Sequence, residues 1–207
     1  VLALEVVLPD GTLQSFGSTS GFASGLDLVG VLTGSEGTLG IITQATVRLT
    51  ARPEKVETLL VVFAELVSAC EAVTRIIRSG IVPAALEIMD QRTIRAIEAS
   101  VYAGGLPTDA GAILLIELDG PAAGLTEQVR RIEVLVREVG AWSVAVAQDE
   151  SERLRFWRAR KSAFGAMGRI APDVYVHDAV VPRSKLPEVL KKVCEIGDRF
   201  GLILSNV

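Results

Sequence analysis

The sequence contains one histidine and two cysteines among its 207 residues. A single histidine, His177, excludes a conventional metal site built on several histidines, and it leaves a Ser-His-Asp triad only one candidate base. Two cysteines are too few for a disulfide scaffold. Cys70 and Cys194 both fall on the apolar side of a helical pattern, which favours buried free thiols in a reducing cytoplasm.

The chain also lacks a dense cluster of lysine and arginine, and its net charge is -4. This charge argues against nucleic acid as a partner. No apolar run approaches the length of a membrane span, so no transmembrane segment is predicted. Hydrophobic residues make up 49% of the chain and charged residues 22%, a composition that predicts a packed core rather than a disordered chain.

Both ends of the sequence have the apolar pattern of a strand. Residues 1–16 read as a hairpin with a Pro-Asp-Gly turn, and residues 202–207 stop in an apolar run that no turn follows. We therefore expect the sequence to be a fragment of a larger protein. Strand edges left open at residues 1–16 and 40–49 would pair with another copy, which predicts a homodimer through these strands or disorder in this part of the chain.

Turn residues and hydrophobic periodicity divide the chain near residue 54. Before this point the patterns predict the hairpin, a short helix near residues 26–32 and a strand at residues 40–49. After it, strands and helices alternate. Strands are predicted at residues 56–63, 84–89, 113–118, 142–146, 174–181 and from 202 onward. Helices are predicted at residues 66–77, 91–99 (capped by Asp90), 125–139, 150–167 and 185–200.

Repeated strand–helix units form either a doubly wound parallel sheet or a ferredoxin-like antiparallel sheet. No glycine-rich phosphate loop follows any of the later strands, which weakens the parallel alternative. We therefore predict an α+β fold for residues 55–207, namely a ferredoxin-like antiparallel sheet with helices on one face. Residues 1–54 are predicted to belong to a different domain.

Three glycines (Gly34, Gly37 and Gly40) crowd the stretch TGSEGTLGIITQATVRL, residues 33–49. One interpretation is a tight loop that carries the chain from a helix into a strand. The other is that exposed backbone N–H groups approach a flat or phosphate-bearing cofactor. The residues alone leave both interpretations open.

Three stretches together resemble one known family. They are GLDLVGVLTGSEGTLGIITQATVRLTARP (residues 25–53), VPAALEIMDQ (residues 82–91) and FWRARKSAFGAMGRIAPDVYVHDAVVPRSKLPEV (residues 156–189). In their residues, order and spacing, these stretches resemble the corresponding segments of FAD-linked oxidases of the vanillyl-alcohol oxidase type. The resemblance is strongest to the branch of glycolate oxidase FAD-linked subunits and D-lactate dehydrogenases. The resemblance covers nearly the whole chain and is weakest between residues 100 and 149.

The resemblance implies that residues 1–54 are the C-terminal part of an FAD-binding domain and residues 55–207 a cap domain, truncated at its C-terminus, that holds the substrate. In this family the glycine-rich loop lies along the FAD through backbone contacts. The family's pyrophosphate loop and its histidine motif would fall outside this sequence, so we expect the fragment alone to hold no FAD and to be inactive, with the catalytic base beyond residue 207. The cofactor-binding residues carried over are Glu36, Gly37, Thr38, Gly40, Ile41 and Ile42.

Arg160 has apolar neighbours at helical spacing (Phe156, Trp157, Ala163 and Phe164). Its guanidinium either extends to water from that face or grips a carboxylate with its planar fork. The resemblance favours the second role, because an arginine at this position contacts the substrate carboxylate in these enzymes. Lys161 is a weaker second candidate. No role is assigned to Glu87, and His177 is predicted to be a surface or structurally satisfied residue.

The resemblance implies that the full-length protein uses FAD to oxidise a small 2-hydroxy acid, of the glycolate or D-lactate type, to the 2-oxo acid. A cytoplasmic location and partner subunits of an oxidase complex are expected with it. The alternative is a non-catalytic ferredoxin-like domain that binds a ligand or regulates another protein and needs no flavin.

Overall fold

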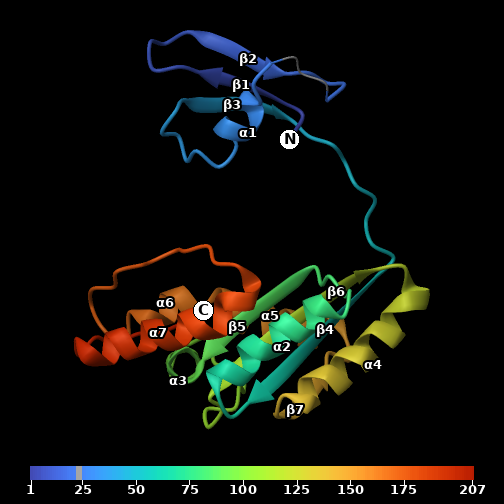
Figure 1. The fold of residues 1–207 in the computed structure, drawn as a ribbon, viewed down its shortest axis with the longest axis vertical. Coiled ribbons are helices and arrows are strands. Elements are labelled where there is room, and N and C mark those ends of the chain that lie inside the picture. The colour runs from blue at the N-terminus through green and yellow to red at the C-terminus, as the bar shows by residue number, and fades with distance from the viewer. Residues whose placement is uncertain (22–24) are drawn as a thin grey trace. The chain divides into compact units, whose positions relative to one another are not determined.

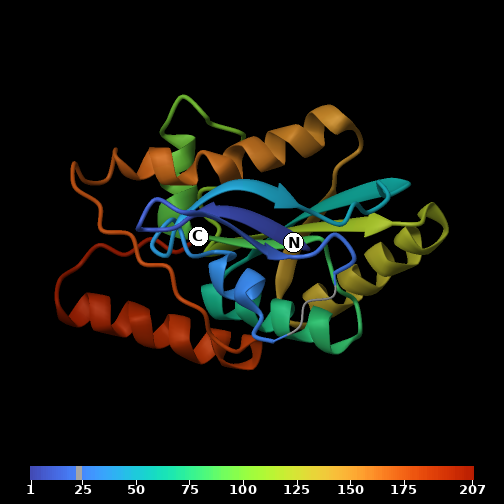
Figure 2. The ribbon, with the colours of Figure 1, turned by 90° about the horizontal axis from the view of Figure 1, so that it is seen from above.

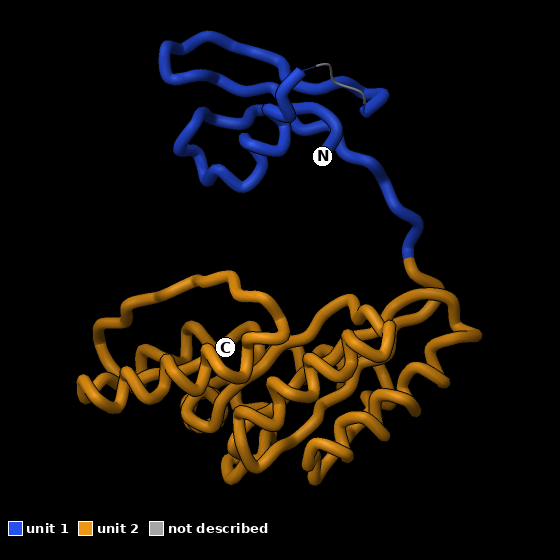
Figure 3. The backbone as a smooth tube through the Cα atoms, in the orientation of Figure 1, with its two compact units in different colours: residues 1–52 blue, residues 53–207 orange. Residues whose placement is uncertain are grey.

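The computed structural model describes residues 1–21 and 25–207, and these residues form two compact units (Figures 1 and 3). The first unit is residues 1–52 and the second is residues 53–207. The division falls close to the boundary predicted between residues 54 and 55. Each unit is built around its own sheet.

The first unit is a small antiparallel sheet of strand order β2-β1-β3, with one short helix. Its elements are β1 (Ala3–Val7), β2 (Leu13–Gly17), α1 (Leu28–Leu32) and β3 (Ile41–Thr46). The Asp10 carboxylate accepts hydrogen bonds from the N–H and hydroxyl of Thr12 and closes the hairpin turn. Leu4, Val6 and Leu32 are buried between helix and sheet. The predicted hairpin, helix and third strand are confirmed.

The second unit contains a four-stranded sheet of order β5-β6-β4-β7, in which all neighbouring strands are antiparallel. Its strands are β4 (Lys55–Phe63), β5 (Ala85–Asp90), β6 (Ala112–Gly120) and β7 (Ala141–Val146). Helix α2 (Leu66–Arg78) connects β4 to β5, and helix α4 (Ala122–Glu138) connects β6 to β7. This β-α-β-β-α-β arrangement is the predicted ferredoxin-like fold.

Helices cover both faces of this sheet (Figures 1 and 2). Alternate side chains of β4 such as Leu59 and Val61 pack against α2 and α4, as the one-face prediction requires. The intervening side chains Leu60 and Val62 pack against a second layer that was not predicted. It consists of α3 (Gln91–Glu98), α5 (Glu150–Lys161) and α6 (Ala163–Met167). The second layer follows from the continuous apolar runs of β4 and β6, which leave no polar face for water.

Two predicted strands are wrong. Residues 174–181 and 202–207 form no strand, because a strand needs a continuous ladder of N–H and C=O pairs with a sheet edge. Among the described residues, 202–207 make only a single contact of this kind, from the N–H of Asp90 at the end of edge strand β5 to the carbonyl of Asn206. Val180 is 99% exposed, so the β-branched pattern of the first segment does not mark a buried face. In the second segment Asn206 exchanges hydrogen bonds with Asp90, which also caps α3 by accepting the N–H of Thr93.

The last helix, α7 (Leu186–Arg199), follows a 3-10 turn at Arg183–Lys185 and packs against α2. The helix predicted over residues 150–167 is divided at Ser162 into α5 and α6. Both cysteines are free thiols. Cys70 of α2 is buried as predicted, whereas Cys194 of α7 is only partly buried.

Candidate functional site

The glycine-rich loop between α1 and β3 has an unusual backbone. Gly34, Glu36 and Gly37 have φ angles of 82°, 51° and 77°. This left-handed region suits glycine, but it is uncommon for a side chain such as that of Glu36. The loop is tightened by the N–H and hydroxyl of Thr38, which both donate to the carbonyl of Ser35. The first interpretation of the glycines, a tight loop between a helix and a strand, is therefore confirmed.

The same loop leaves polar groups without protein partners. Within residues 1–21 and 25–207, the N–H groups of Glu36 and Gly37 donate to no acceptor, and the buried hydroxyl of Ser35 has no hydrogen-bond partner. Buried polar groups without partners are rare in native proteins, and consecutive free N–H groups in such a loop favour a negatively polarised ligand. The residues present therefore fit a cofactor that is contacted through the backbone.

Gly40 has a different reason to lack a side chain. A Cβ at this position would lie 2.7 Å from Cγ1 of Val6 and 2.9 Å from the carbonyl oxygen of Val7, both closer than van der Waals contact allows. Gly40 is thus required by the packing of the loop against β1. Ile41 and Ile42, which follow it on β3, are 62% and 42% exposed. The six predicted cofactor residues form one continuous loop and strand start, and their contact with FAD stays a prediction.

The structure places Arg160 in the last turn of α5, with its guanidinium against a carboxylate of the sheet. Its Nη2 lies 2.8 Å and its Nε 3.0 Å from Oε2 of Glu87 on β5. The Arg160 side chain is 25% exposed, so the guanidinium neither lies in bulk water nor is sealed off. Glu87, to which the sequence assigned no role, is therefore the residue that holds Arg160.

The neighbouring charges of α5 lie elsewhere. Lys161 is exposed, and its Nζ lies 5.8 Å from the centre of the Trp157 ring. Arg158 is exposed, as predicted for a solvated residue. His177 lies on an exposed segment, with its ring 4.6 Å from that of Tyr175, which agrees with the predicted surface role. Among the described residues, no group of three or more His, Cys, Asp or Glu side chains could hold a metal ion.

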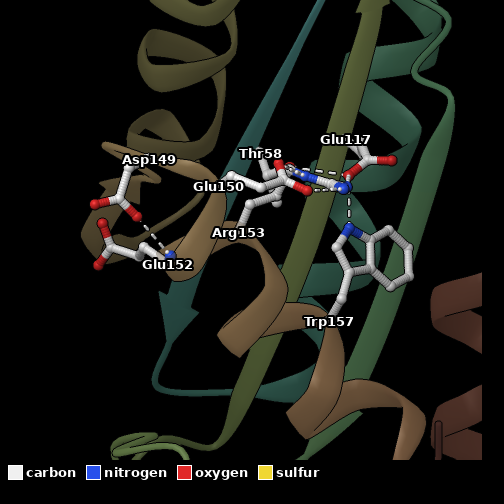
Figure 4. Close-up of polar contacts among 7 residues, drawn as sticks. All are labelled: Thr58, Glu117, Asp149, Glu150, Glu152, Arg153 and Trp157. Carbon is white, nitrogen blue, oxygen red and sulfur yellow. Dashed lines mark hydrogen bonds and ion pairs between the residues drawn. The ribbon is translucent and has the colours of Figure 1, made fainter.

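A second carboxylate of the same sheet face binds α5 one turn earlier (Figure 4). Oε2 of Glu117 accepts hydrogen bonds from the hydroxyl of Thr58 at 2.9 Å, Nη1 of Arg153 at 2.9 Å and Nε1 of Trp157 at 2.6 Å. Arg153 also pairs with Glu150, and the pKa of Arg153 is raised because both carboxylates accept its hydrogen bonds.

Sequence reasoning missed this cluster, although a signal for it exists. Glu87 and Glu117 are single carboxylates inside apolar strand runs, and such charges need partners when a helix covers them. Arg153, Trp157 and Arg160 follow at spacings of four and three, which places them on one side of a helix. The pairing itself joins residues 73 and 36 positions apart, which no local pattern reveals.

The fold and this helix–sheet site define an α+β domain in which helices cover both faces of a ferredoxin-like sheet. Residues 52–207 match the family model of FAD linked oxidases, C-terminal domain, and the chain belongs to this family. Among the described residues, no helix has both the length and the apolar character needed to span a membrane.

Curated relatives match the whole chain. It is 43% identical over 207 residues to "Glycolate oxidase subunit GlcD" of Escherichia coli (strain K12) and 40% identical over 208 residues to the protein of the same name in Bacillus subtilis (strain 168). It is 30% identical over 210 residues to "D-lactate dehydrogenase [cytochrome], mitochondrial" of Arabidopsis thaliana. The match covers 100% of this chain in each case, but only 41%, 44% and 36% of the relatives.

Solved structures with little sequence identity share the fold. A 4-ethylphenol oxidase from Gulosibacter chungangensis is 16% identical with a TM-score of 0.69, over 99% of this chain and 48% of that one. An alkyldihydroxyacetonephosphate synthase is 19% identical with a TM-score of 0.64, over 94% of this chain and 40% of that one. These two likenesses show a shared fold, and the predicted resemblance to FAD-linked oxidases is confirmed by the family match.

Proposed function

We propose that the full-length protein oxidises a small 2-hydroxy acid of the glycolate or D-lactate type to the 2-oxo acid, with FAD as cofactor. The family membership and the names of the relatives support the reaction class. The observation within the chain that carries the proposal is the bonding of Arg160. Its guanidinium is held by Glu87 through Nε and Nη2, and it still has N–H groups that can donate to a ligand.

A guanidinium has five N–H donors, one on Nε and two each on Nη1 and Nη2, and they lie along separate edges of the planar group. Glu87 occupies the edge formed by Nε and Nη2 of Arg160. Among the described residues Nη1 has no partner, so the edge formed by Nη1 and Nη2 can donate two parallel hydrogen bonds to a second carboxylate. In this proposal Arg160 binds the substrate carboxylate there and fixes the orientation of the α-carbon. Lys161 is a weaker candidate for the same contact.

When bound, FAD supplies the acceptor for the hydride that leaves the substrate α-carbon. The residues proposed to hold it are Glu36, Gly37, Thr38, Gly40, Ile41 and Ile42. The free N–H groups of Glu36 and Gly37 would contact polar atoms of the cofactor, while the exposed side chains of Ile41 and Ile42 offer apolar contact. We assign no catalytic base to this chain.

We also propose that the full-length protein has partner subunits and a cytoplasmic location. The two bacterial relatives are named as subunits of glycolate oxidase, which supports partner subunits for the full-length protein. A cytoplasmic location is favoured by the two free thiols.

The test is a flavin spectrum and an anaerobic reduction experiment on the purified full-length protein. We expect the absorption bands of bound flavin and their bleaching by glycolate or D-lactate. A full-length protein that is colourless and binds no FAD would overturn the proposal in favour of a non-catalytic ferredoxin-like domain. If the full-length protein holds FAD but neither acid reduces it, the proposed cofactor stands and the proposed substrate class is wrong.

A further inference from the structure

Helix α5 is fixed to the sheet by one polar stripe. Arg153, Trp157 and Arg160 lie on the same side of the helix, because they are separated by four and then three residues. All three donate hydrogen bonds to carboxylates of the sheet. Arg153 and Trp157 share Glu117, and Arg160 takes Glu87. The helix is therefore held by two carboxylates, by Glu117 at Arg153 and Trp157 and by Glu87 one turn further along at Arg160.

The two carboxylates lie on the same face of the sheet. In the register of β5 against β6, Glu87 is opposite Leu115 and Ala85 is opposite Glu117. Leu115 belongs to the buried cluster that α5 covers. Since side chains alternate between faces along a strand, Glu117 points to the same side as Leu115. The register thus places both carboxylates on the face of the sheet that α5 covers.

The contact at Arg160 leaves its distal edge accessible. Both of its bonded nitrogens converge on one oxygen, Oε2 of Glu87. The pair is 25% and 31% exposed at the side chains, and ion pairs of this exposure add little to stability. What the pair does constrain is the set of side-chain conformations open to Arg160, since a long side chain held at one edge loses most of its freedom.

We infer that Glu87 is a positioning residue for substrate binding: it holds the inner edge of Arg160 so that the outer edge, formed by Nη1 and Nη2, faces the substrate carboxylate. The Glu117 cluster supports this arrangement by fixing the rotation of α5 about its axis. The inference rests on the proposed role of Arg160. It adds a residue that touches neither substrate nor cofactor and acts only through the arginine.

The experiment is a double-mutant cycle in the full-length protein with Glu87→Gln and Arg160→Ala. The glutamine keeps the size of the side chain and removes the charge that holds the guanidinium. We expect Glu87→Gln alone to raise KM for the 2-hydroxy acid about tenfold or more, as for loss of a charge-assisted hydrogen bond. The dissociation constant of oxalate, measured by calorimetry, should rise by a similar factor. In the Arg160→Ala background, Glu87→Gln should add almost nothing, because its effect passes through the arginine.

Glu57→Gln is the matched control. Glu57 is also a partly buried strand glutamate in an ion pair, with Lys55, but it alternates with Thr58 and therefore lies on the other face of the sheet, with Leu59 and Val61. It should leave both KM and oxalate binding unchanged. If Glu87→Gln does not fold, Glu87→Asp keeps the charge and withdraws it by one methylene group, and a smaller rise in KM is expected.

The outcomes separate the two proposals. Equal losses from Glu87→Gln with and without Arg160, or a loss no greater than that of Glu57→Gln, would overturn the positioning role while the oxidase function stands. A wild-type protein that oxidises no 2-hydroxy acid and binds no oxalate would overturn the proposed function and the inference together.

Discussion

Arg160 of α5 and Glu87 of β5 lie 73 residues apart in the chain and meet at 2.8 Å between Nη2 and Oε2. The ion pair joins a helix of the second layer to the edge strand of the ferredoxin-like sheet. Because it occupies one edge of the guanidinium only, it turns an arginine that would otherwise extend to water into a fixed donor.

Arg160→Ala in the full-length protein is expected to lower kcat/KM for the 2-hydroxy acid by about ten- to more than a hundredfold. This range corresponds to about 1.5–3 kcal/mol for hydrogen bonds to a charged group. Arg160→Lys keeps the charge but loses the planar fork, so it should recover only part of the loss. Steady-state kinetics, with flavin content and Tm measured in parallel, checks the expectation.

Arg158→Ala is the control for this substitution. It removes the same side chain from the same helix, but from an exposed position, and it should change kcat/KM little. Equal, small effects of the two alanine substitutions would show that Arg160 does not bind the carboxylate.

Local chemistry explains what could be predicted from the sequence. The strands and helices of the ferredoxin-like unit follow from apolar periodicity. The start of α3 follows from Asp90, an N-cap residue whose side chain accepts the N–H of Thr93. These features depend on neighbours within a few residues. The order of the four strands then follows from a standard arrangement of such units.

The parts that could not be predicted depend on distant partners. The apolar pattern of residues 174–181 is that of a strand, but a strand exists only where a sheet edge is free to pair with it. The second helical layer had to be inferred from strands apolar on both faces. The bonds of Arg160 to Glu87 and of Trp157 to Glu117 join segments that only the folded sheet brings together.

Glu117→Ala is expected to destabilise the second unit by about 1–3 kcal/mol. The substitution leaves the hydroxyl of Thr58 and the indole N–H of Trp157 without an acceptor in a largely buried site, and orphaned donors there are costly. Urea unfolding followed by tryptophan fluorescence measures the change. Glu138→Ala, which breaks an exposed pair with Arg75, should cost about 0–1 kcal/mol. A cost for Glu117→Ala within that lower range would contradict the cluster's structural role.

Gly40→Ala is expected to destabilise the first unit by about 1–3 kcal/mol, since the new methyl group would overlap Val6 and the carbonyl of Val7. Hydrogen exchange of the amides in β1 and β3 should show the loss. Gly124→Ala on α4 has room for its methyl group, with its nearest neighbour at 3.8 Å, and should instead stabilise that helix by about 0.5–1 kcal/mol. Unchanged exchange in Gly40→Ala would mean that the loop does not pack against β1 as described.

The 207-residue chain is expected to associate with itself through the open strands of the first unit. Leu13 of β2 and Ile42 of β3 are 59% and 42% exposed on the two edge strands, and apolar edges favour pairing with a second copy. Light scattering over a range of concentrations should show dimers. Lysine at both positions should restore the monomer, and a wild-type chain that is monomeric at every concentration would exclude this pairing.

Stability is expected to fall between about pH 9 and pH 11 because of Cys70. Burial raises the pKa of its thiol from 9.0 to about 11. Below pH 9 the thiol is protonated in the folded and unfolded chains alike, so its contribution to stability is fully present. Above pH 9 the unfolded chain loses the proton while the folded chain keeps it, which favours unfolding. Urea unfolding at pH 8, 9, 10 and 11 measures the fall in the free energy of unfolding.

The two cysteine variants are the controls. Cys70→Ala should remove most of the fall with pH, whatever the substitution does to stability at pH 8, whereas Cys194→Ala should leave the fall in place. If the free energy of unfolding falls equally with pH in the wild-type chain, Cys70→Ala and Cys194→Ala, the Cys70 thiol is not buried in a low-dielectric site.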